Sequence, residues 1–515
     1  MLVTLWKPRD VGRKRRTMER WDVVVVGSGN AALCAALAAQ EDATRILVIE
    51  KAPREMAGGN TQYTAGAMRF VYDGKDDLLP LLRDPADPRL ERTDFGAYTA
   101  ETFTNDLLQF NEGRALSPEQ EVLISRSYPT MRWLAERGVK FEPIYDRQSF
   151  EKEGRYVFWG GLTLASAREG VGLFETERTA FEAGGGVVRY DCAATGLLVE
   201  EDRVVGVKAT TPEGDEEIRA GAVVLGCGGF EASEEMRRRH MGEIWAGAKV
   251  RGTPHNTGDG LRMALDLGAM PYGFFAGCHA TPMDLHMKDF GNLEIPHGDR
   301  KHYRKICYFL GVMLNARGER FVDEGADFRN YTYAQFGRAV LEQPGQFAWQ
   351  VFDAKVEDLL YAEYRFHDAH WVEDTTLDGL VGKLAGVDRA SALQTLQAFN
   401  ESIMEEVPFD PTVKDGRGTR GLALPKSNWA QRLDTPPFKA FPVTGGITFT
   451  YGGLKVDDGG AVTRDDGDPI PGLFACGEIV GGVFFHGYPG GAGLTSGAVF
   501  GRIAGQGAAR HALSD

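Results

Sequence analysis

The chain has 515 residues and a mass of 56.4 kDa, enough for two domains or for one large domain with a substantial insertion. Hydrophobic residues make up 43% and charged residues 25%, which is typical of a soluble globular protein, whereas 65 glycines are unusually many. The net charge of −15 and the pI of about 5.3 argue against binding to nucleic acid or to an anionic membrane.

The six cysteines are scattered without a CxxC pair, so we expect no metal site and no disulfide framework, and a cytoplasmic location. Residues 1–19 contain a basic run but no apolar core long enough for a signal peptide. We expect a disordered tail there, or upstream sequence if Met18 is the natural start. No apolar run approaches the roughly 18 residues that a membrane span needs.

A βαβ unit is predicted at the start of the folded chain. The apolar run 22–26 is followed by GSGNAA at 27–32, an alanine-rich helix and a second strand that ends at Glu50. Small residues in a GxGxxA turn let a diphosphate approach a helix N-terminus, and an acid about 20 residues further on accepts from a ribose hydroxyl. This combination predicts a dinucleotide site.

Three later segments repeat the change from strand or loop to glycines, at 57–67, 223–230 and 471–482. Their spread along the chain indicates one extended ligand touched by both ends, which favours FAD over NAD. The pattern stops before a middle region, 274–447, that is richer in aromatic and charged residues. We interpret this region as an inserted domain.

Together these segments resemble the fumarate reductase and succinate dehydrogenase flavoprotein superfamily. The resemblance rests on GGNTQYTAGAM (58–68), NTGDGLRMALDLGA (256–269), GERFVDE (318–324) and PIPGLFACGEIVGG (469–482). It implies an α/β fold in which a Rossmann-type FAD-binding domain, 20–273 and 448–515, carries an inserted α+β capping domain, 274–447. It also implies an oxidoreductase that acts on a CH–CH bond beside an electron-withdrawing group.

Within the superfamily, GERFVDEGADFRNYTYAQFGR and FHGYPGGAGLTSGAVFGR look most like the tricarballylate dehydrogenase group. That resemblance implies oxidation of tricarballylate to cis-aconitate, by proton abstraction and hydride transfer to flavin N5. It also implies electron transfer to a membrane-bound iron–sulfur and haem partner, which would bring the chain to the inner membrane face. The soluble fumarate reductases are less similar, because the runs Thr448-Phe449-Thr450-Tyr451-Gly452-Gly453 and Tyr488-Pro489-Gly490 stand where they have a carboxylate-binding histidine and arginine.

Other readings stay open. The Tyr-Pro-Gly-x-x-Gly run is also similar to 3-ketosteroid Δ1-dehydrogenases, in which the counterparts of Tyr488 and Tyr333 serve the chemistry. A fumarate-reductase-like ene-reductase and a precorrin-modifying flavoprotein are the remaining alternatives.

The basic stretch 297–305 favours an acid over a steroid as substrate, because focused positive charge captures polycarboxylates. Arg304 is its strongest candidate, since an apolar strand begins just after it.

The resemblance implies His279 as a substrate contact and Arg329 as the first candidate for proton transfer. Tyr333, with an ordinary pKa near 10, is the chemically easier base. His486 and Tyr488 are expected to face the substrate. Asn60 stands near the place of the histidine that binds flavin covalently in membrane succinate dehydrogenases, so we expect noncovalent FAD. The predicted FAD contacts are Gly27, Gly29, Asn30, Ala31, Glu50, Lys51, Gly59, Asn60, Thr61, Gly66, Ala194, Gly228, Asp259, Gly477, Glu478, Gly493 and Leu494.

Overall fold

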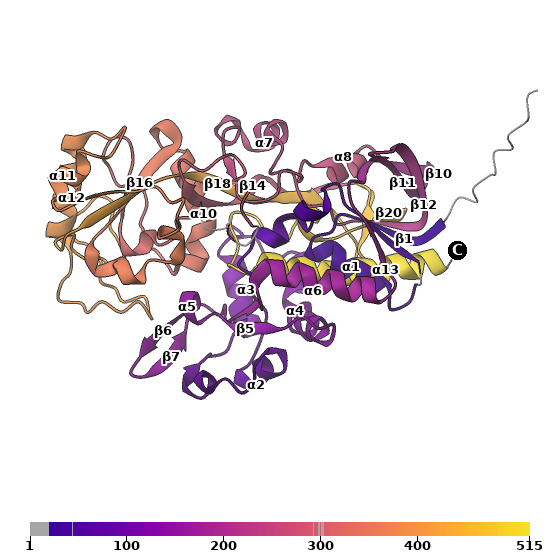
Figure 1. The fold of residues 1–515 in the computed structure, drawn as a ribbon, viewed down its shortest axis with the longest axis horizontal. Helices are drawn as coiled ribbons and strands as arrows, with labels where there is room; N and C mark the ends of the chain where they lie inside the picture. Colours follow the sequence, from indigo (N-terminus) through magenta and orange to yellow (C-terminus); the bar gives the residue numbers. More distant parts are fainter. Residues whose placement is uncertain (1–19, 44, 292, 297–298, 300–302, 515) are drawn as a thin grey trace, which may run out of the picture.

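The computed structural model describes residues 20–43, 45–291, 293–296, 299 and 303–514. The predicted tail and most of the basic stretch, residues 297–298 and 300–302, lie outside the described residues. The described chain is mixed α/β, as predicted, and is built around two sheets that Figure 1 shows side by side along the long axis. Within these residues, no helix combines the length and the apolar character that a membrane crossing requires.

The first sheet has a parallel core in the order β20-β12-β1-β2-β9. The valines of β1 are buried on both faces, as expected for a strand in the middle of a parallel sheet. These strands are β1 (Arg20–Val26), β2 (Ile46–Ile49), β9 (Val187–Arg189), β12 (Gly214–Leu225) and β20 (Pro469–Ala475). Antiparallel partners extend it: β10 (Ala193–Glu200), β11 (Arg203–Thr211) and β19 (Ala461–Thr463).

Helices from both ends of the chain pack together against this sheet. Nearly all of α1 (Asn30–Ala39) is buried, and α13 (Ala492–Leu513) lies along it. The close approach depends on two glycines of α13, because a Cβ at Gly501 or Gly505 would collide with the backbone of α1. α6 (Glu169–Ala183) packs on α1 as well. The nucleotide-binding turn is therefore held by sequence from both termini of the fold.

The second sheet carries the middle of the chain. Its two long strands, β14 (Pro271–Asp284) and β18 (Phe438–Leu454), pair antiparallel and run from the first sheet's side into the cap (Figure 1). The predicted domain boundaries at 274 and 447 fall inside these strands, so continuous sheet joins the two regions at those points. The division itself stays a prediction. The shorter strands are β13 (Lys249–Val250), β15 (Val312–Leu314), β16 (Phe347–Phe352) and β17 (Val372–Asp374).

Helices complete the second region. α10 (Arg329–Leu341) packs on β14 and β18, while α11 (Leu377–Val381) and α12 (Arg389–Ser402) cover the outer end with an apolar cluster of their own. α7 (Glu234–Met241) and α8 (Asp259–Leu265) precede β14.

A third lobe is formed by residues between the second glycine segment and α6, at the bottom of Figure 1. Its strands make two small sheets, β3-β8-β5 and β4-β7-β6. The strands are β3 (Ala67–Met68), β4 (Thr93–Asp94), β5 (Phe141–Pro143), β6 (Ser149–Lys152), β7 (Arg155–Phe158) and β8 (Leu164–Ser166), and the helices are α2 (Lys75–Leu78), α3 (Ala100–Leu108), α4 (Pro118–Glu136) and α5 (Tyr145–Gln148).

Candidate active site

A long cavity runs from the first βα turn to the inner side of the cap. All four glycine segments line it, through Gly29, Gly59, Gly228 and Gly477 among others. Of the predicted FAD contacts, Gly66 alone does not line this cavity. A Cβ on Gly66 would collide with Ser166 and with the backbone of Glu169. The glycine at this position is therefore explained by close packing against those residues. The other predicted contacts converge on one space, as an extended ligand requires.

Two helix N-termini face this space. The residues that begin α1, Gly29 to Ala31, line the cavity, and Gly29 offers no side-chain cap for the first amides. α13 begins in the same way, with Gly491 in a left-handed conformation (φ 88°) and no side-chain cap. The Asn30 N–H donates to the Thr61 hydroxyl at 2.9 Å and the Ala492 N–H to the Pro489 carbonyl at 3.1 Å, while the positive potential of each helix N-terminus suits phosphate and other anionic groups. A Cβ on Gly59 would meet no atom within 4 Å, so that backbone borders open space.

Glu50 is held where the sequence predicted a ribose acceptor. Its Oε2 accepts from the Ser28 hydroxyl at 2.6 Å, and its Oε1 accepts from the Ala52 N–H at 2.8 Å. Lys51 beside it donates to Asp259 at 2.6 Å. All of these except Ala52 lie on the cavity wall, so an acid and an ion pair border the nucleotide end.

A buried acid pair stands further along the wall. Glu478 lines the cavity and accepts from the Thr450 N–H at 2.7 Å, while Glu231 accepts from Asn60 at 2.7 Å and from Asn256 at 2.6 Å. The two carboxyl groups also contact each other. Burial, and then the charge of Glu231, raise the pKa of Glu478 well above its ordinary value. The raised pKa favours the protonated form of Glu478 beside Glu231.

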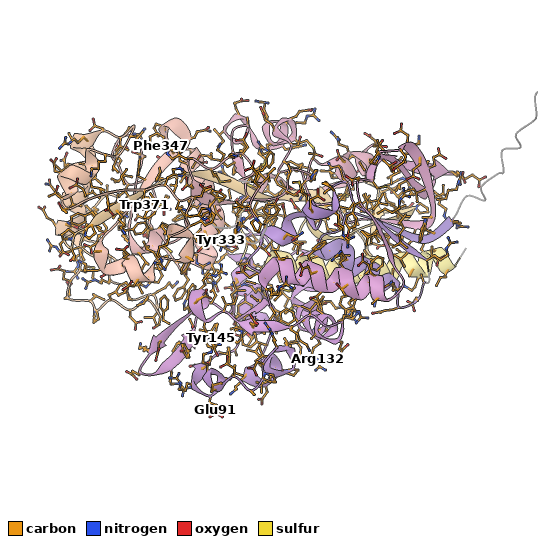
Figure 2. All side chains as sticks on the ribbon, in the orientation of Figure 1. Glu91, Arg132, Tyr145, Tyr333, Phe347 and Trp371 are labelled. Carbon is orange, nitrogen blue, oxygen red and sulfur yellow. The ribbon has the colours of Figure 1, made fainter. Side chains whose placement is uncertain are left out.

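At the cap end, two tyrosines meet. The hydroxyl oxygens of Tyr333, on α10, and Tyr488, in the C-terminal glycine loop, lie 2.5 Å apart, and both rings are at least nine-tenths buried. Figure 2 places Tyr333 near the middle of the molecule. Burial, and then Tyr333, raise the pKa of Tyr488 well above its ordinary value. The raised pKa favours the protonated form of Tyr488, and either hydroxyl can be the donor in the bond between the two tyrosines.

The glycine loop is fixed from two sides. Arg69 is fully buried, and its Nε donates to the Gly490 carbonyl at 2.7 Å. On the other side, the Gly490 N–H donates to the Asn330 carbonyl at 2.9 Å and Gln335 donates to the His486 carbonyl at 3.1 Å, which ties the loop to α10. These bonds fix Tyr488 against Tyr333.

Four arginines line the same end of the cavity: Arg147, Arg251, Arg304 and Arg329. Arg304 forms a buried ion pair with Glu363. Although burial opposes ionisation, Arg304 and Arg147 lower the pKa of Glu363 to about 2, so this pair is ionised. Arg147 pairs with Glu169 at 2.6 Å and lies 3.8 Å from Glu363.

Arg329 has a different environment. One of its terminal nitrogens donates to the Arg147 carbonyl at 3.0 Å and to the Tyr361 hydroxyl at 3.3 Å, and its guanidinium lies over the rings of Trp159 and Tyr361. Burial lowers the pKa of Arg329, but Tyr361 and Tyr333 outweigh burial and leave that pKa above its ordinary value. The raised pKa favours the cationic form of Arg329, which suits the guanidinium to holding an anion.

The two predicted histidines lie off the cavity wall. His279, on β14, is fully buried behind the tyrosines, with its ring stacked on Phe449 and edge-on to Tyr333 and Tyr488. Burial, then Arg251, lowers the pKa of His279 well below its ordinary value, so the ring is neutral. His486 instead points to Glu112, 3.1 Å from its Nδ1, and packs on Phe274.

Sequence reasoning did not single out Arg147, Arg251 or Glu231. Arg251 lies five residues before the NTGDG segment, a spacing that could have marked it as a neighbour of the cofactor. Arg147 and Glu231 have no comparable local signal, because their partners Glu363 and Glu478 are more than 200 residues away.

Comparison with known proteins agrees with this geometry. The family model for the FAD binding domain matches residues 22–495. A probable fumarate reductase of Shewanella frigidimarina, Ifc3, is 27% identical over 506 residues, covering 96% of this chain and 76% of that protein. The chain spans only 48% of the NADH:fumarate oxidoreductase of Klebsiella pneumoniae, to which it is 25% identical over 96% of its own length.

A second group of relatives has another activity. The 3-oxosteroid 1-dehydrogenase of Mycobacterium tuberculosis is 25% identical over 576 residues, covering 95% of this chain and 98% of that one. Among solved structures, the open conformation of a flavocytochrome c3 fumarate reductase is similar, with a TM-score of 0.71 and 26% identity over 96% of this chain and 79% of that chain. The cavity, the family model and these relatives establish FAD as the cofactor.

Proposed function

Because the chain belongs to the FAD-binding-domain family of the fumarate reductase and succinate dehydrogenase flavoproteins, we propose that it oxidises a C–C single bond beside a carboxylate of a tricarboxylic acid. The proposed reaction converts tricarballylate to cis-aconitate. One observation carries this proposal: arginine side chains adjoin the Tyr333–Tyr488 pair in the cofactor cavity. Guanidinium groups hold carboxylates by two parallel hydrogen bonds, so this end of the cavity suits a polycarboxylate.

Bound FAD supplies an acceptor for a hydride. The residues that would hold it are the helix N-termini at Gly29 and Gly491, Glu50 at the nucleotide end, and Glu478 along the wall. Asn60 uses both ends of its amide in hydrogen bonds within the protein, to Glu231 and from the Thr253 N–H. Noncovalent binding stays part of the proposal.

The protein's own part in the reaction is to hold the acid and to take one proton. A carboxylate bound by Arg329 or Arg304 withdraws electrons from the adjacent carbon, which eases loss of a proton there. Tyr333 is the proposed base, because Tyr488 keeps its own proton and supports negative charge on the Tyr333 oxygen through the 2.5 Å hydrogen bond. As the proton leaves, its bonding electrons form the new double bond, and hydride leaves the neighbouring carbon.

A specific observation also favours a second candidate, a 3-ketosteroid-type dehydrogenase. The tyrosine pair is the one on which that resemblance rests, and Phe449 and Phe484 add apolar surface to the cavity. In this reading a tyrosine hydroxyl would donate to the ketone oxygen. Tricarballylate remains the first proposal, because a neutral ketone would leave the buried Arg251 and Arg329 without an anion.

Anaerobic reduction of the purified yellow protein separates the two candidates. Tricarballylate, succinate and a 3-ketosteroid are mixed with the oxidised protein in turn, and loss of the flavin absorbance is followed. We expect tricarballylate to bleach the flavin. Bleaching by the steroid alone would refute the proposal and support the second candidate.

The electrons need an outlet, and we propose a protein acceptor at the inner membrane face that carries iron–sulfur or haem centres. The similarity to a flavocytochrome supports a redox partner of this kind. Membrane fragments from the source cell, added to the substrate-reduced protein, should speed flavin reoxidation without oxygen; no acceleration would argue against this partner.

A further inference from the structure

Arg251 is the most unusual of the four arginines in the cavity. It follows β13, its backbone N–H donates to the Ile447 carbonyl at 2.8 Å, and its Nε donates to the Thr448 hydroxyl at 3.0 Å. The side chain lines the cavity, yet the residue is only 8% exposed. Within the described part of the chain, no carboxylate lies within 4 Å of its guanidinium and the terminal nitrogens have no hydrogen-bond partner.

Other buried arginines show what a compensated guanidinium looks like. Arg237 donates to three backbone carbonyls, Arg304 pairs with Glu363, and Arg69 pairs with Asp106 and donates to two carbonyls. A buried cation without such partners is costly, because it loses hydration and gains nothing in return. The contrast indicates that the partner of Arg251 is a ligand.

Arg329 shares this lack of an acid. It donates to a carbonyl and to a tyrosine hydroxyl, and its Nε is buried without a partner, whereas Arg147 and Arg304 are paired with Glu169 and Glu363. The wall beside the tyrosines thus carries two guanidinium groups, Arg251 and Arg329, that no carboxylate of the described residues neutralises.

We propose that Arg251 anchors one carboxylate of the substrate while Arg329 receives another, so that the site selects acids with at least two carboxylates. This inference rests on the proposed function and narrows it. In this proposal Arg251 replaces the arginine that the C-terminal glycine loop lacks. Arg251 follows β13, and the Thr448 hydroxyl orients its guanidinium toward the anion.

The electrostatics of Arg251 support such a role. Burial, then repulsion from Arg304, lowers the pKa of Arg251 to about 10, so the group is still a cation at neutral pH. The same repulsion is relieved when an anion binds between the arginines. Polycarboxylate affinity should therefore be lost as the pH rises toward 10.

The test is a binding titration of the holoenzyme after its FAD has been chemically reduced, so that the acids bind without being oxidised, and binding is read by isothermal titration calorimetry. Tricarballylate, succinate and butyrate are compared on the wild type, on Arg251→Gln and on Arg338→Gln. Arg338 is an exposed arginine on α10 that pairs with Glu342, and serves as the matched control. FAD content and Tm show whether each variant is folded.

We expect the wild type to bind the two polycarboxylates on the order of 100-fold more tightly than butyrate, and Arg251→Gln to lose about that factor. Arg338→Gln should match the wild type. If Arg251→Gln does not fold, Thr448→Val provides a second route: it removes the orienting hydroxyl and should weaken polycarboxylate binding about tenfold.

The outcomes separate this inference from the proposed function. If the wild type binds polycarboxylates and Arg251→Gln or Thr448→Val binds them equally well, Arg251 is not the anchor, although the proposed function survives. Equal affinity of the wild type for butyrate and succinate would also overturn the two-carboxylate rule. If the wild type binds no acid but is bleached by the ketosteroid, the proposed function fails and this inference fails with it.

Discussion

At the scale of single residues, Tyr333 and Tyr488 bring together two positions that are 155 residues apart in the sequence. Replacing Tyr333 by Phe removes the proposed base and leaves the ring packing intact. We expect the rate of flavin reduction to fall by about 10²- to 10⁴-fold with normal FAD content, measured by anaerobic stopped-flow absorbance.

Tyr308→Phe is the control for this experiment. Tyr308 is also buried, and its hydroxyl is hydrogen-bonded to Thr332, but Tyr308 does not line the cavity. Removal of the Tyr308 hydroxyl should therefore leave the rate of flavin reduction near that of the wild type. A Tyr333→Phe variant that reduces its flavin at the normal rate would transfer the role of the base to another group.

The acid pair gives a prediction about pH and stability. Burial raises the pKa of Glu231 in the folded protein, so this carboxyl contributes stability below its unfolded pKa of about 4.3, and that contribution is lost as the pH rises through the folded pKa. Glu231→Gln keeps the oxygen that accepts from Asn60 and Asn256 but removes the titration. The Tm of Glu231→Gln minus the Tm of the wild type should therefore increase as the pH is raised from 5 to 8.

The size of this effect is bounded. One proton changes the free energy of unfolding by at most about 1.4 kcal/mol per pH unit. Thermal unfolding monitored by circular dichroism at several pH values provides the measurement, with the exposed Glu373→Gln as the control. Parallel Tm curves for Glu231→Gln and the wild type would show that the pair does not titrate in this range.

At this scale, the sequence predicts a site residue when the pattern that marks it lies within a few neighbouring residues. The contacts at Gly29, Glu50 and Glu478 follow from strand, turn and helix signals a few residues long, and the structure brings them to one cavity. The spacing of Arg251 from the NTGDG segment could mark it as a neighbour of the cofactor, but its proposed role depends on the lack of an acid partner around it in space, which the sequence does not reveal. The orientation of His486 toward Glu112 depends on a packing contact between distant segments and was not foreseen.

At the scale of elements, the contact between α1 and α13 positions the nucleotide turn. Gly505→Val should force the helices apart, since even a Cβ would collide with Ala35 of α1. Overpacking of this kind costs about 1–3 kcal/mol. We expect a lower Tm and weaker FAD retention, measured as the absorbance ratio at 450 and 280 nm after gel filtration.

Arg510→Ala, on an exposed position of the same helix, is the matched control and should keep its FAD. Full FAD content in Gly505→Val would mean that the turn does not depend on this helix contact. The predicted βαβ unit agrees with the structure because its signals are local, whereas the role of α13 as its cover required knowledge of the tertiary fold.

At the scale of the whole molecule, FAD joins parts that lie at opposite ends of the chain. A ligand that binds only the folded state stabilises it by RT ln(1 + [L]/Kd). The Tm of apoprotein should therefore rise with the logarithm of added FAD, measured by differential scanning calorimetry. A Tm that is independent of FAD concentration would contradict a cavity shared between the first and last segments.

The placement of α13 has a consequence for synthesis. During translation α1 emerges early, yet its alanine-rich surface is covered by a helix that does not begin until residue 492. A growing chain must therefore extend past residue 492 before α13 can cover α1, and the apolar helix is uncovered until then. FAD binding to the complete cavity should follow the release of α13 from the ribosome.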